Sequence, residues 1–320
     1  MMLSTIFKPL IYNKGLYSKM VERSHLCGCR YLTTCNSIKR IGIIGAGKIG
    51  SAMIRAFKEC FTDVEIIATG RRDVTLRNAE LLGARVTRDN DEAVRSSDLI
   101  ILSVKPYHFP DVVRQVNKDS WRGKIVVSVM AGVKLKTLKL ILGEAEIYRA
   151  MPNINTYVKK SSTAITHLGD PQHRELVEKT FRCIGSVYWV PEEVIDAWTA
   201  MAGSGPAYIV EIIDALVLGG IAVGMPRDLA YMAILDVLEG TASLLRNNSN
   251  VHPLEIRDEV TTPAGTTIRG LMVFESHGVK AALMKTVEAA YKRSLSIGGE
   301  IDDYVREQLG LNNAEKQGTK

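Results

Sequence analysis

The sequence predicts an α/β protein, in which an N-terminal Rossmann-type doubly wound parallel sheet precedes a C-terminal all-α dimerisation domain. Short apolar runs alternate with helical periodicity over residues 38–191, and a glycine fingerprint closes the first run. From residue 192 onward, apolar residues recur only at the i, i+3, i+4 spacing of helices. We therefore divide the chain into a basic extension (1–37), an α/β domain (38–191), a helical domain (192–301) and a tail (302–320).

The α/β domain is predicted from runs of the length and composition of strands. Residues 98–104 and 124–132 are near-continuous apolar runs rich in β-branched residues, which is typical of buried central strands in a parallel sheet. Segments with helical periodicity separate the runs, so we expect helices on both faces of the sheet. The predicted strands cover residues 41–45, 64–70, 84–87, 98–104, 124–132, 146–153, 161–168 and 186–191.

The first strand leads into GAGKIG, residues 45–50, which matches the dinucleotide fingerprint GxGxxG. In such a loop Gly45 permits the tight turn, Gly47 lets the backbone approach a pyrophosphate, and Gly50 lets the helix pack closely on the sheet. The pyrophosphate then lies at the helix N-terminus, where free N–H groups and the helix dipole favour an anion. The alternative is a glycine turn without a ligand, but the flanking strand and helix favour a dinucleotide site.

The residues after the second strand indicate which dinucleotide binds. NAD sites usually place Asp or Glu there for the ribose 2′-hydroxyl, whereas this strand ends in ATGRR, residues 68–72. The guanidinium groups of Arg71 and Arg72 suit a 2′-phosphate. The alternative is a pair of solvated arginines that Asp73 partly neutralises. We therefore predict NADPH in preference to NADH.

Two further strand ends contribute to the expected site, because ligands of open α/β sheets bind outside the carboxyl ends of the strands. Lys105 and Pro106 follow one strand. We expect the lysine either to contact the cofactor or a substrate carboxylate, or simply to extend into solvent. The next strand ends in VMAG, where Ala131 and Gly132 are small enough for a nicotinamide to lie against the backbone.

The helical domain contains one segment that is apolar nearly all round, residues 207–225. Glu211 and Asp214 lie in its middle, and charges are costly in lipid, so we expect a buried helix and no membrane span. A dimer with interlocking helices would bury such a segment. The alternative is a monomer whose helices pack on the α/β domain.

The N-terminal extension carries the net charge. Residues 1–40 hold seven Lys or Arg residues and one acid, which accounts for the whole formal charge of +6. A neutral body argues against nucleic-acid binding. The extension is acid-poor and amphipathic, typical of a mitochondrial transit peptide; the alternatives are a plain extension on a cytoplasmic protein, or a true start at Met20. Three of the five cysteines also lie there and match no zinc spacing, so we expect no metal site and no structural disulfide.

Six motifs together resemble the pyrroline-5-carboxylate reductases. They are GAGKIGSAM, SVKP, MAGV, RAMPN, GSGPAY and DEVTTPAGTTIRGL, in this order and spacing between about residues 41 and 298. The resemblance implies reduction of 1-pyrroline-5-carboxylate to L-proline with NADPH or NADH, the last step of proline biosynthesis. It also implies a Rossmann domain and a helical dimerisation domain, in homodimers that often assemble into larger rings.

The resemblance also implies which residues form the site. Cofactor contacts fall on Ile44, Gly45, Ala46, Gly47, Lys48, Ile49 and Gly50, on Asn90 beside the adenosine, on Ser103, Val104, Lys105 and Pro106, and on Val129, Met130 and Ala131 beside the nicotinamide. Substrate contacts fall on Glu192, Thr262, Thr266 and Thr267. Thr267 is the predicted catalytic residue, because its hydroxyl would orient the imine for hydride.

The substrate loop departs from the resemblance at Ala264, where many relatives have glycine. Alanine tolerates a positive φ poorly, so we expect the loop backbone to differ there. Without the resemblance, the threonines would suit an ordinary helix N-cap.

The chemistry of the residues favours imine reduction, because none of the six histidines lies in a convincing acid–base motif. Two other functions stay open. One is another NADP-dependent hydroxyacid-dehydrogenase-like enzyme, although GSGPAYIVEI lacks the lysine of its GxxGxxxK-type helix. The other is an inactive NADP-binding dimeric scaffold.

Overall fold

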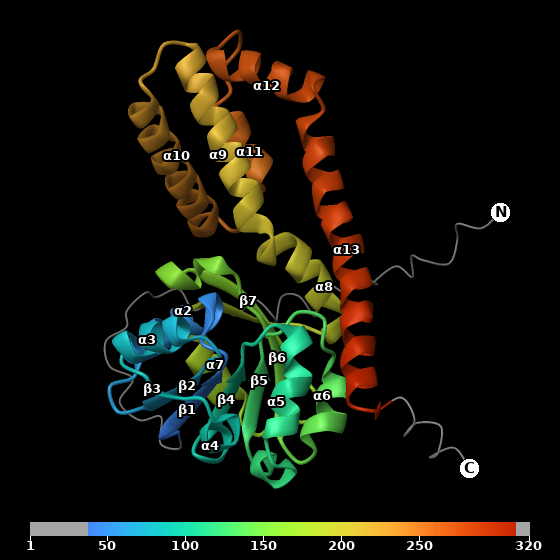
Figure 1. Cartoon of the computed structure of the whole chain (residues 1–320). Coiled ribbons are helices and arrows are strands. Elements are labelled where there is room, and N and C mark those ends of the chain that lie inside the picture. Colours follow the sequence, from blue (N-terminus) through green and yellow to red (C-terminus); the bar gives the residue numbers. More distant parts are fainter. Residues whose placement is uncertain (1–37, 312–320) are drawn as a thin grey trace, which may run out of the picture.

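The computed structural model describes residues 38–311, so the predicted transit peptide lies outside the described residues. Figure 1 shows two bodies, an α/β domain built on one sheet and a helical domain that rises above it. The side of the α/β domain that carries the glycine loop faces the helical domain. There Tyr157 donates to the carbonyl of Lys48, and nearby Lys160 forms an ion pair with Glu239 of the helical domain.

All eight strands belong to one sheet, in the order β3-β2-β1-β4-β5-β6-β7-β8. Strands β1 to β6 pair in parallel, which confirms the doubly wound arrangement. The sheet departs from a purely parallel one at β7, which pairs antiparallel with β6. The connection between them, residues 152–160, is too short for the helical crossover that a parallel pair needs. The strands are β1 (Arg40–Ile44), β2 (Glu65–Thr69), β3 (Arg85–Thr87), β4 (Leu99–Leu102), β5 (Ile125–Ser128), β6 (Glu146–Met151), β7 (Ser161–His167) and β8 (Gly185–Trp189).

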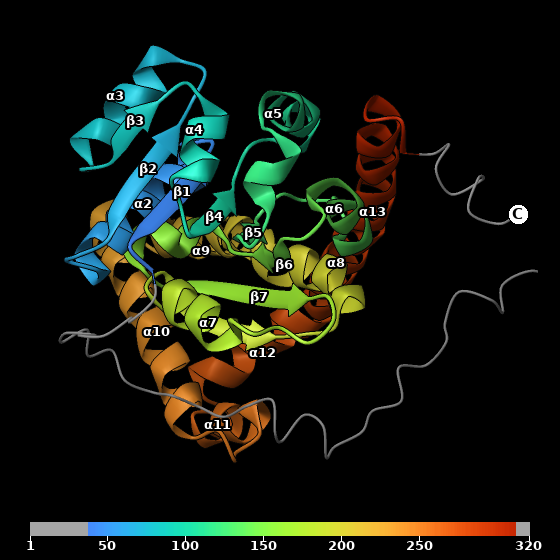
Figure 2. The same cartoon turned by 90° about the horizontal axis from the view of Figure 1, so that it is seen from below.

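Helices cover both faces of this sheet, as predicted. Phe57 and Phe181 are fully buried on one face, and Phe109 and Leu138 on the other. Figure 2 shows α5 and α6 on one side of the sheet and α7 on the other. The helices are α2 (Lys48–Cys60), α3 (Asp73–Leu81), α4 (Asn90–Arg95), α5 (Phe109–Gln115), α6 (Leu135–Leu142) and α7 (Arg174–Arg182).

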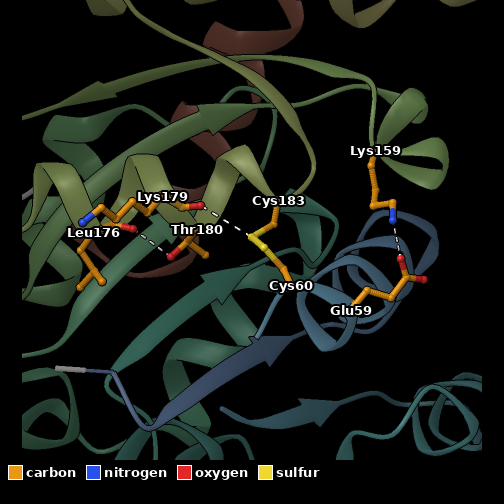
Figure 3. Close-up of a disulfide and its surroundings, with 7 residues drawn as sticks. All are labelled: Glu59, Cys60, Lys159, Leu176, Lys179, Thr180 and Cys183. Atoms are coloured by element: carbon orange, nitrogen blue, oxygen red, sulfur yellow. Dashed lines mark hydrogen bonds and ion pairs between the residues drawn. A yellow bond between two sulfur atoms is a disulfide. The ribbon is translucent and has the colours of Figure 1, made fainter. Parts of the chain in front are cut away.

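A disulfide joins Cys60 to Cys183, so the prediction of no structural disulfide is wrong. Cys60 is the last residue of α2 and Cys183 follows the last residue of α7. Both helices cover the same face of the sheet, and their ends meet there although the two cysteines are 123 positions apart in the sequence (Figure 3). Cysteine spacing along the chain does not reveal this pairing, because the sheet topology creates it.

After β8 the chain passes through a short irregular turn into the helical domain, and the last helix of that domain packs back on the α/β domain. Its last helix, α13, runs to Gln308, beyond the predicted domain boundary at residue 301. Ile301 and Val305 are buried in the core beside α5 and α6, which is why the helix continues. The elements are η4 (Glu192–Val194), α8 (Ile195–Trp198), η5 (Thr199–Gly203), α9 (Gly205–Ala222), α10 (Arg227–Asn247), α11 (Pro253–Glu259), α12 (Thr266–Ser276) and α13 (Val279–Gln308).

The helical domain exposes apolar surface over most of its length. Within a single chain Val217 is the buried residue of α9 and Ala230 that of α10. Val210 is 61% exposed and Met232 is 57% exposed. Packing of these helices on the α/β domain, the monomer alternative, is therefore wrong. Among residues 38–311, one stretch, Glu192–Ala222, is long and apolar enough to cross a membrane, by length and composition only.

Candidate active site

The glycine loop between β1 and α2 has the geometry that a dinucleotide requires. Gly45 adopts φ +99°, which an L side chain rarely does. A Cβ on Gly50 would lie 2.4 Å from the carbonyl oxygen of Gly45, so a side chain there would separate helix and loop. A Cβ on Gly47 would meet no atom within 4 Å. The space above Gly47 is therefore open, as the approach of a pyrophosphate demands.

The N-terminus of α2 is free to bind an anion. No side chain caps it, and its first turn, which begins at Lys48 and Ile49, contains no acid. The first N–H groups of a helix have no acceptor within the helix and carry the positive end of the dipole. The chain thus offers donors and a favourable field where the fingerprint predicts a phosphate.

The segment after β4 supports the glycine loop and then turns away from it. The hydroxyl of Ser103 donates to the carbonyl of Gly45 at 2.5 Å, and Val104 packs against the same glycine. Pro106 begins the short helix η1 (Pro106–His108) directly after the exposed Lys105. Among these four residues, Ser103 and Val104 hold the loop, while Lys105 projects into solvent at the strand end.

The segment after β2 brings together basic side chains. The Nη1 atom of Arg71 lies 3.4 Å from Nδ1 of His108, on η1. Arg72 is exposed and has no side-chain partner within residues 38–311. Asn90, at the start of α4, donates to Gln115 of α5 at 2.6 Å. Ala46 donates to the carbonyl of Thr69, which ties the end of β2 to the glycine loop.

The segment expected beside the nicotinamide, residues 129–132, lies against α13. Met130 is buried, whereas Ala131 is exposed. Gly132 adopts φ +86°, and a Cβ there would lie 2.9 Å from Cβ of Ile301. The glycine therefore allows the last helix of the chain to pack directly on this segment.

Two carboxylates from the helical domain bind the first turn of α6, immediately after that segment. Glu192 Oε1 accepts from the N–H of Leu135 at 2.8 Å and from Nη1 of Arg149 at 3.1 Å. Asp302 accepts from the N–H of Lys134 and from the hydroxyl of Thr137, each at 2.9 Å. Glu192 and Asp302 thus attach both ends of the helical domain to one helix terminus.

These contacts place Glu192 apart from the other predicted substrate residues. Its carboxylate is 30% exposed and forms an ion pair with the guanidinium of Arg149, which is only 3% exposed. Neither Arg149 nor Asp302 is among the residues that the sequence predicts for the site. The available signal was a charged residue inside an apolar run: Arg149 interrupts the strand EIYRAM, and Asp302 interrupts the buried stripe of α13.

The threonine loop lies between α11 and α12. Its helix begins at Thr266 after an N-cap at Gly265, so Thr266 and Thr267 provide first-turn N–H groups, as predicted. No side chain caps α12, and its first turn contains no acid. Ala264 adopts φ +59°, so the loop keeps a left-handed residue although the residue is alanine. Gly265 donates to the carbonyl of Thr262 at 3.1 Å, and a Cβ there would lie 2.3 Å from the Thr262 hydroxyl.

The threonine loop does not meet the glycine loop within one chain. Figure 1 shows α12 at the end of the helical domain farthest from the sheet. Within a single chain, the length of the helical domain therefore separates the threonine loop from the glycine loop.

Comparisons with known proteins find matches to both domains. The family described as pyrroline-5-carboxylate reductase dimerisation matches residues 192–297, and NADP oxidoreductase coenzyme F420-dependent matches residues 40–132. Pyrroline-5-carboxylate reductase of Synechocystis sp. is 35% identical over 81% of this chain and 98% of its own. The Pisum sativum enzyme is 36% identical over 79% of this chain and 94% of its own. The solved Streptococcus pyogenes reductase is 31% identical, with a TM-score of 0.73 over 80% of this chain and 98% of its own. The chain belongs to the pyrroline-5-carboxylate reductase family.

Proposed function

We propose that this protein reduces 1-pyrroline-5-carboxylate to L-proline with NADPH as the preferred hydride donor, and so completes proline biosynthesis. The observation that carries the proposal is the match to named reductases over nearly their whole length, 98% for the Synechocystis enzyme. The open glycine loop and the uncapped α2 fit a dinucleotide. The cofactor supplies the hydride, and the chain supplies binding and orientation.

The residues of the threonine loop suit the substrate's carboxylate. Uncapped N–H groups of α12 and the hydroxyls of Thr266 and Thr267 are donors for an anion at a helix N-terminus. Reduction of the C=N bond adds hydride at carbon and a proton at nitrogen. The ring nitrogen is basic enough to carry that proton before hydride arrives, so no strong general base is required. Thr267 then fixes which face of the imine meets the hydride.

A complete site forms between two copies of the chain. The threonine loop lies at the far end of the helical domain from its own glycine loop. The exposed apolar faces of α9 and α10 and the dimerisation match at 192–297 support a homodimer. In that homodimer the threonine loop of one chain serves the cofactor half-site of the other.

The assay that tests the function follows NADPH absorbance with purified protein and 1-pyrroline-5-carboxylate. Substrate-dependent loss of NADPH is expected. Bound NADPH without turnover would instead indicate the inactive scaffold, and turnover of 2-hydroxy acids alone would indicate a hydroxyacid dehydrogenase. Thr267→Ala is expected to lower kcat/KM about 100-fold, because a lost orienting hydrogen bond costs roughly 3 kcal/mol. Its affinity for NADPH should match that of the unmodified protein, and unchanged turnover would remove Thr267 from the mechanism.

Mixing two variants, each impaired in one half-site, tests whether the site is shared. Thr267→Ala keeps its cofactor half-site, and Gly47→Asp keeps its threonine loop. A mixed dimer regains one complete site only if the two half-sites come from different chains. Activity restored on mixing supports the shared site, and a mixture as inactive as its components contradicts it.

Two further properties extend the proposal. Residues 1–37 direct the protein to mitochondria, which the basic, acid-poor composition supports. A fluorescent fusion of these residues that stays in the cytoplasm would contradict this localisation.

Dimers associate further into rings, as the family resemblance implies. A solution mass equal to one dimer at all concentrations would contradict ring formation.

A further inference from the structure

We propose that Arg88 sets the cofactor preference, by neutralising the one acid that would otherwise serve the ribose of NADH. The inference rests on the proposed preference for NADPH. It concerns a residue outside the glycine fingerprint and outside the Arg71-Arg72 pair.

The acid is Asp73, the first residue of α3, which lies close to the end of β2 where NAD-specific proteins place their carboxylate. It is 84% exposed, so its charge is open to a ligand. Left unpaired, this carboxylate would accept from a ribose 2′-hydroxyl and repel a 2′-phosphate. Asp73 therefore works against NADPH unless another group balances it.

Arg88, which follows β3, supplies that balance with a two-pronged contact. Its Nη2 forms an ion pair with Asp73, and its Nη1 donates to the carbonyl of Arg71 at 2.8 Å. The planar guanidinium thus holds the carboxylate and the turn together, a geometry that an ammonium does not reproduce. The backbone of residues 71–73 is fixed with its acid already engaged.

The result is a net positive surface at the end of β2. Because Arg88 neutralises Asp73, the positive charges of Arg71 and Arg72 remain available for a ligand. Within residues 38–311, the one contact of the Arg71 side chain is with the half-buried ring of His108. Three guanidinium groups against one carboxylate leave an excess of about two positive charges, which matches the charge of a phosphate monoester near neutral pH.

The test compares dissociation constants for NADPH and NADH, measured by calorimetry, in four forms of the full-length protein. These are the unmodified protein, Arg88→Gln, the double variant Arg88→Gln/Asp73→Asn, and Arg77→Gln as a control. Arg77 is an exposed arginine of α3 without a side-chain partner in the described part of the chain.

Arg88→Gln should reduce the preference for NADPH over NADH by about twofold to fivefold, the size expected when one exposed charge of an ion pair is lost. The double variant should regain most of that preference, because the unpaired acid is gone. Arg77→Gln should leave it unchanged. The same melting temperature for the first three forms without cofactor would exclude a loss of folding.

Three results would overturn the inference. If Arg88→Gln keeps the preference for NADPH over NADH, Arg88 does not determine cofactor specificity, and the proposed function is unaffected. A preference that is lost but not regained in the double variant assigns Arg88 to direct phosphate binding and removes Asp73. An unmodified protein that binds NADH as tightly as NADPH contradicts the proposed preference and this inference with it.

Discussion

The two domains differ in how much of their apolar surface is buried within a single chain. In the α/β domain both faces of the sheet are covered by helices of the same chain, and aromatic side chains such as Phe57, Phe109 and Trp121 are fully buried. In the helical domain the 18-residue α9 buries one side chain, Val217. The first domain is complete as a single chain, and the second is complete only against another surface. The extent of burial within one chain therefore distinguishes the cofactor-binding domain from the domain that forms the oligomer.

The largest effect is expected from a charge on the apolar face of the helical domain. A carboxylate buried without a partner costs several kcal/mol. Val210→Asp should therefore raise the dissociation constant of the oligomer about a thousandfold, or roughly 4 kcal/mol. Light scattering after gel filtration measures the mass.

A matched control uses the other domain. Val74 on α3 is 70% exposed, and Val74→Asp should leave the mass unchanged. An oligomer that tolerates Val210→Asp would show that this part of α9 lies outside the interface.

The disulfide belongs to the α/β domain alone, so its removal should affect that domain alone. Cys60→Ala/Cys183→Ala should lower the free energy of unfolding by about 3 kcal/mol, because the cross-link restricts the unfolded chain. Denaturant titration without reductant measures the loss, and the oligomer mass should not change. Reductant should lower the stability of the unmodified protein toward that of the variant. Equal midpoints for both proteins would show that the cross-link does not contribute.

Two glycines of one loop should separate folding from cofactor binding. Gly50→Ala introduces a clash with the carbonyl of Gly45 and should cost about 2 kcal/mol of stability. Gly47→Ala meets open space and should leave the melting temperature unchanged, yet it should weaken NADPH binding. Thermal unfolding with and without NADPH distinguishes the two. Identical behaviour of the variants would contradict the steric assignment.

The smallest expected effect is a gain in stability from a substitution in the helical domain. Ala264 has a left-handed backbone at φ +59°, so Ala264→Gly should raise the free energy of unfolding by up to about 1 kcal/mol. Neighbouring Gly265→Ala should do the opposite, because its Cβ would collide with the Thr262 hydroxyl. Chemical unfolding of the two variants gives the sign. A loss of stability in Ala264→Gly would show that the greater freedom of the unfolded glycine chain outweighs the relief.

Local patterns predicted much of this molecule. The alternation of apolar runs predicted the sheet, and GAGKIG predicted the loop in which Gly45 makes the turn and Gly50 lets the helix pack closely. The start of α12 at Thr266 was also predicted.

Local patterns did not predict contacts between segments that are distant in the sequence. The Cys60–Cys183 disulfide, the Arg149–Glu192 ion pair and the Arg88–Asp73 contact depend on which strands are neighbours, and residue spacing does not contain that information.

The two attachments at α6 also give the two ends of the helical domain a common anchor. Glu192 and Asp302 hold adjacent N–H groups, those of Leu135 and Lys134. Both ends of the domain are therefore fixed to the helix turn that directly follows residues 129–132. The placement of the helical domain and the placement of the segment expected beside the nicotinamide thus depend on the same few backbone N–H groups.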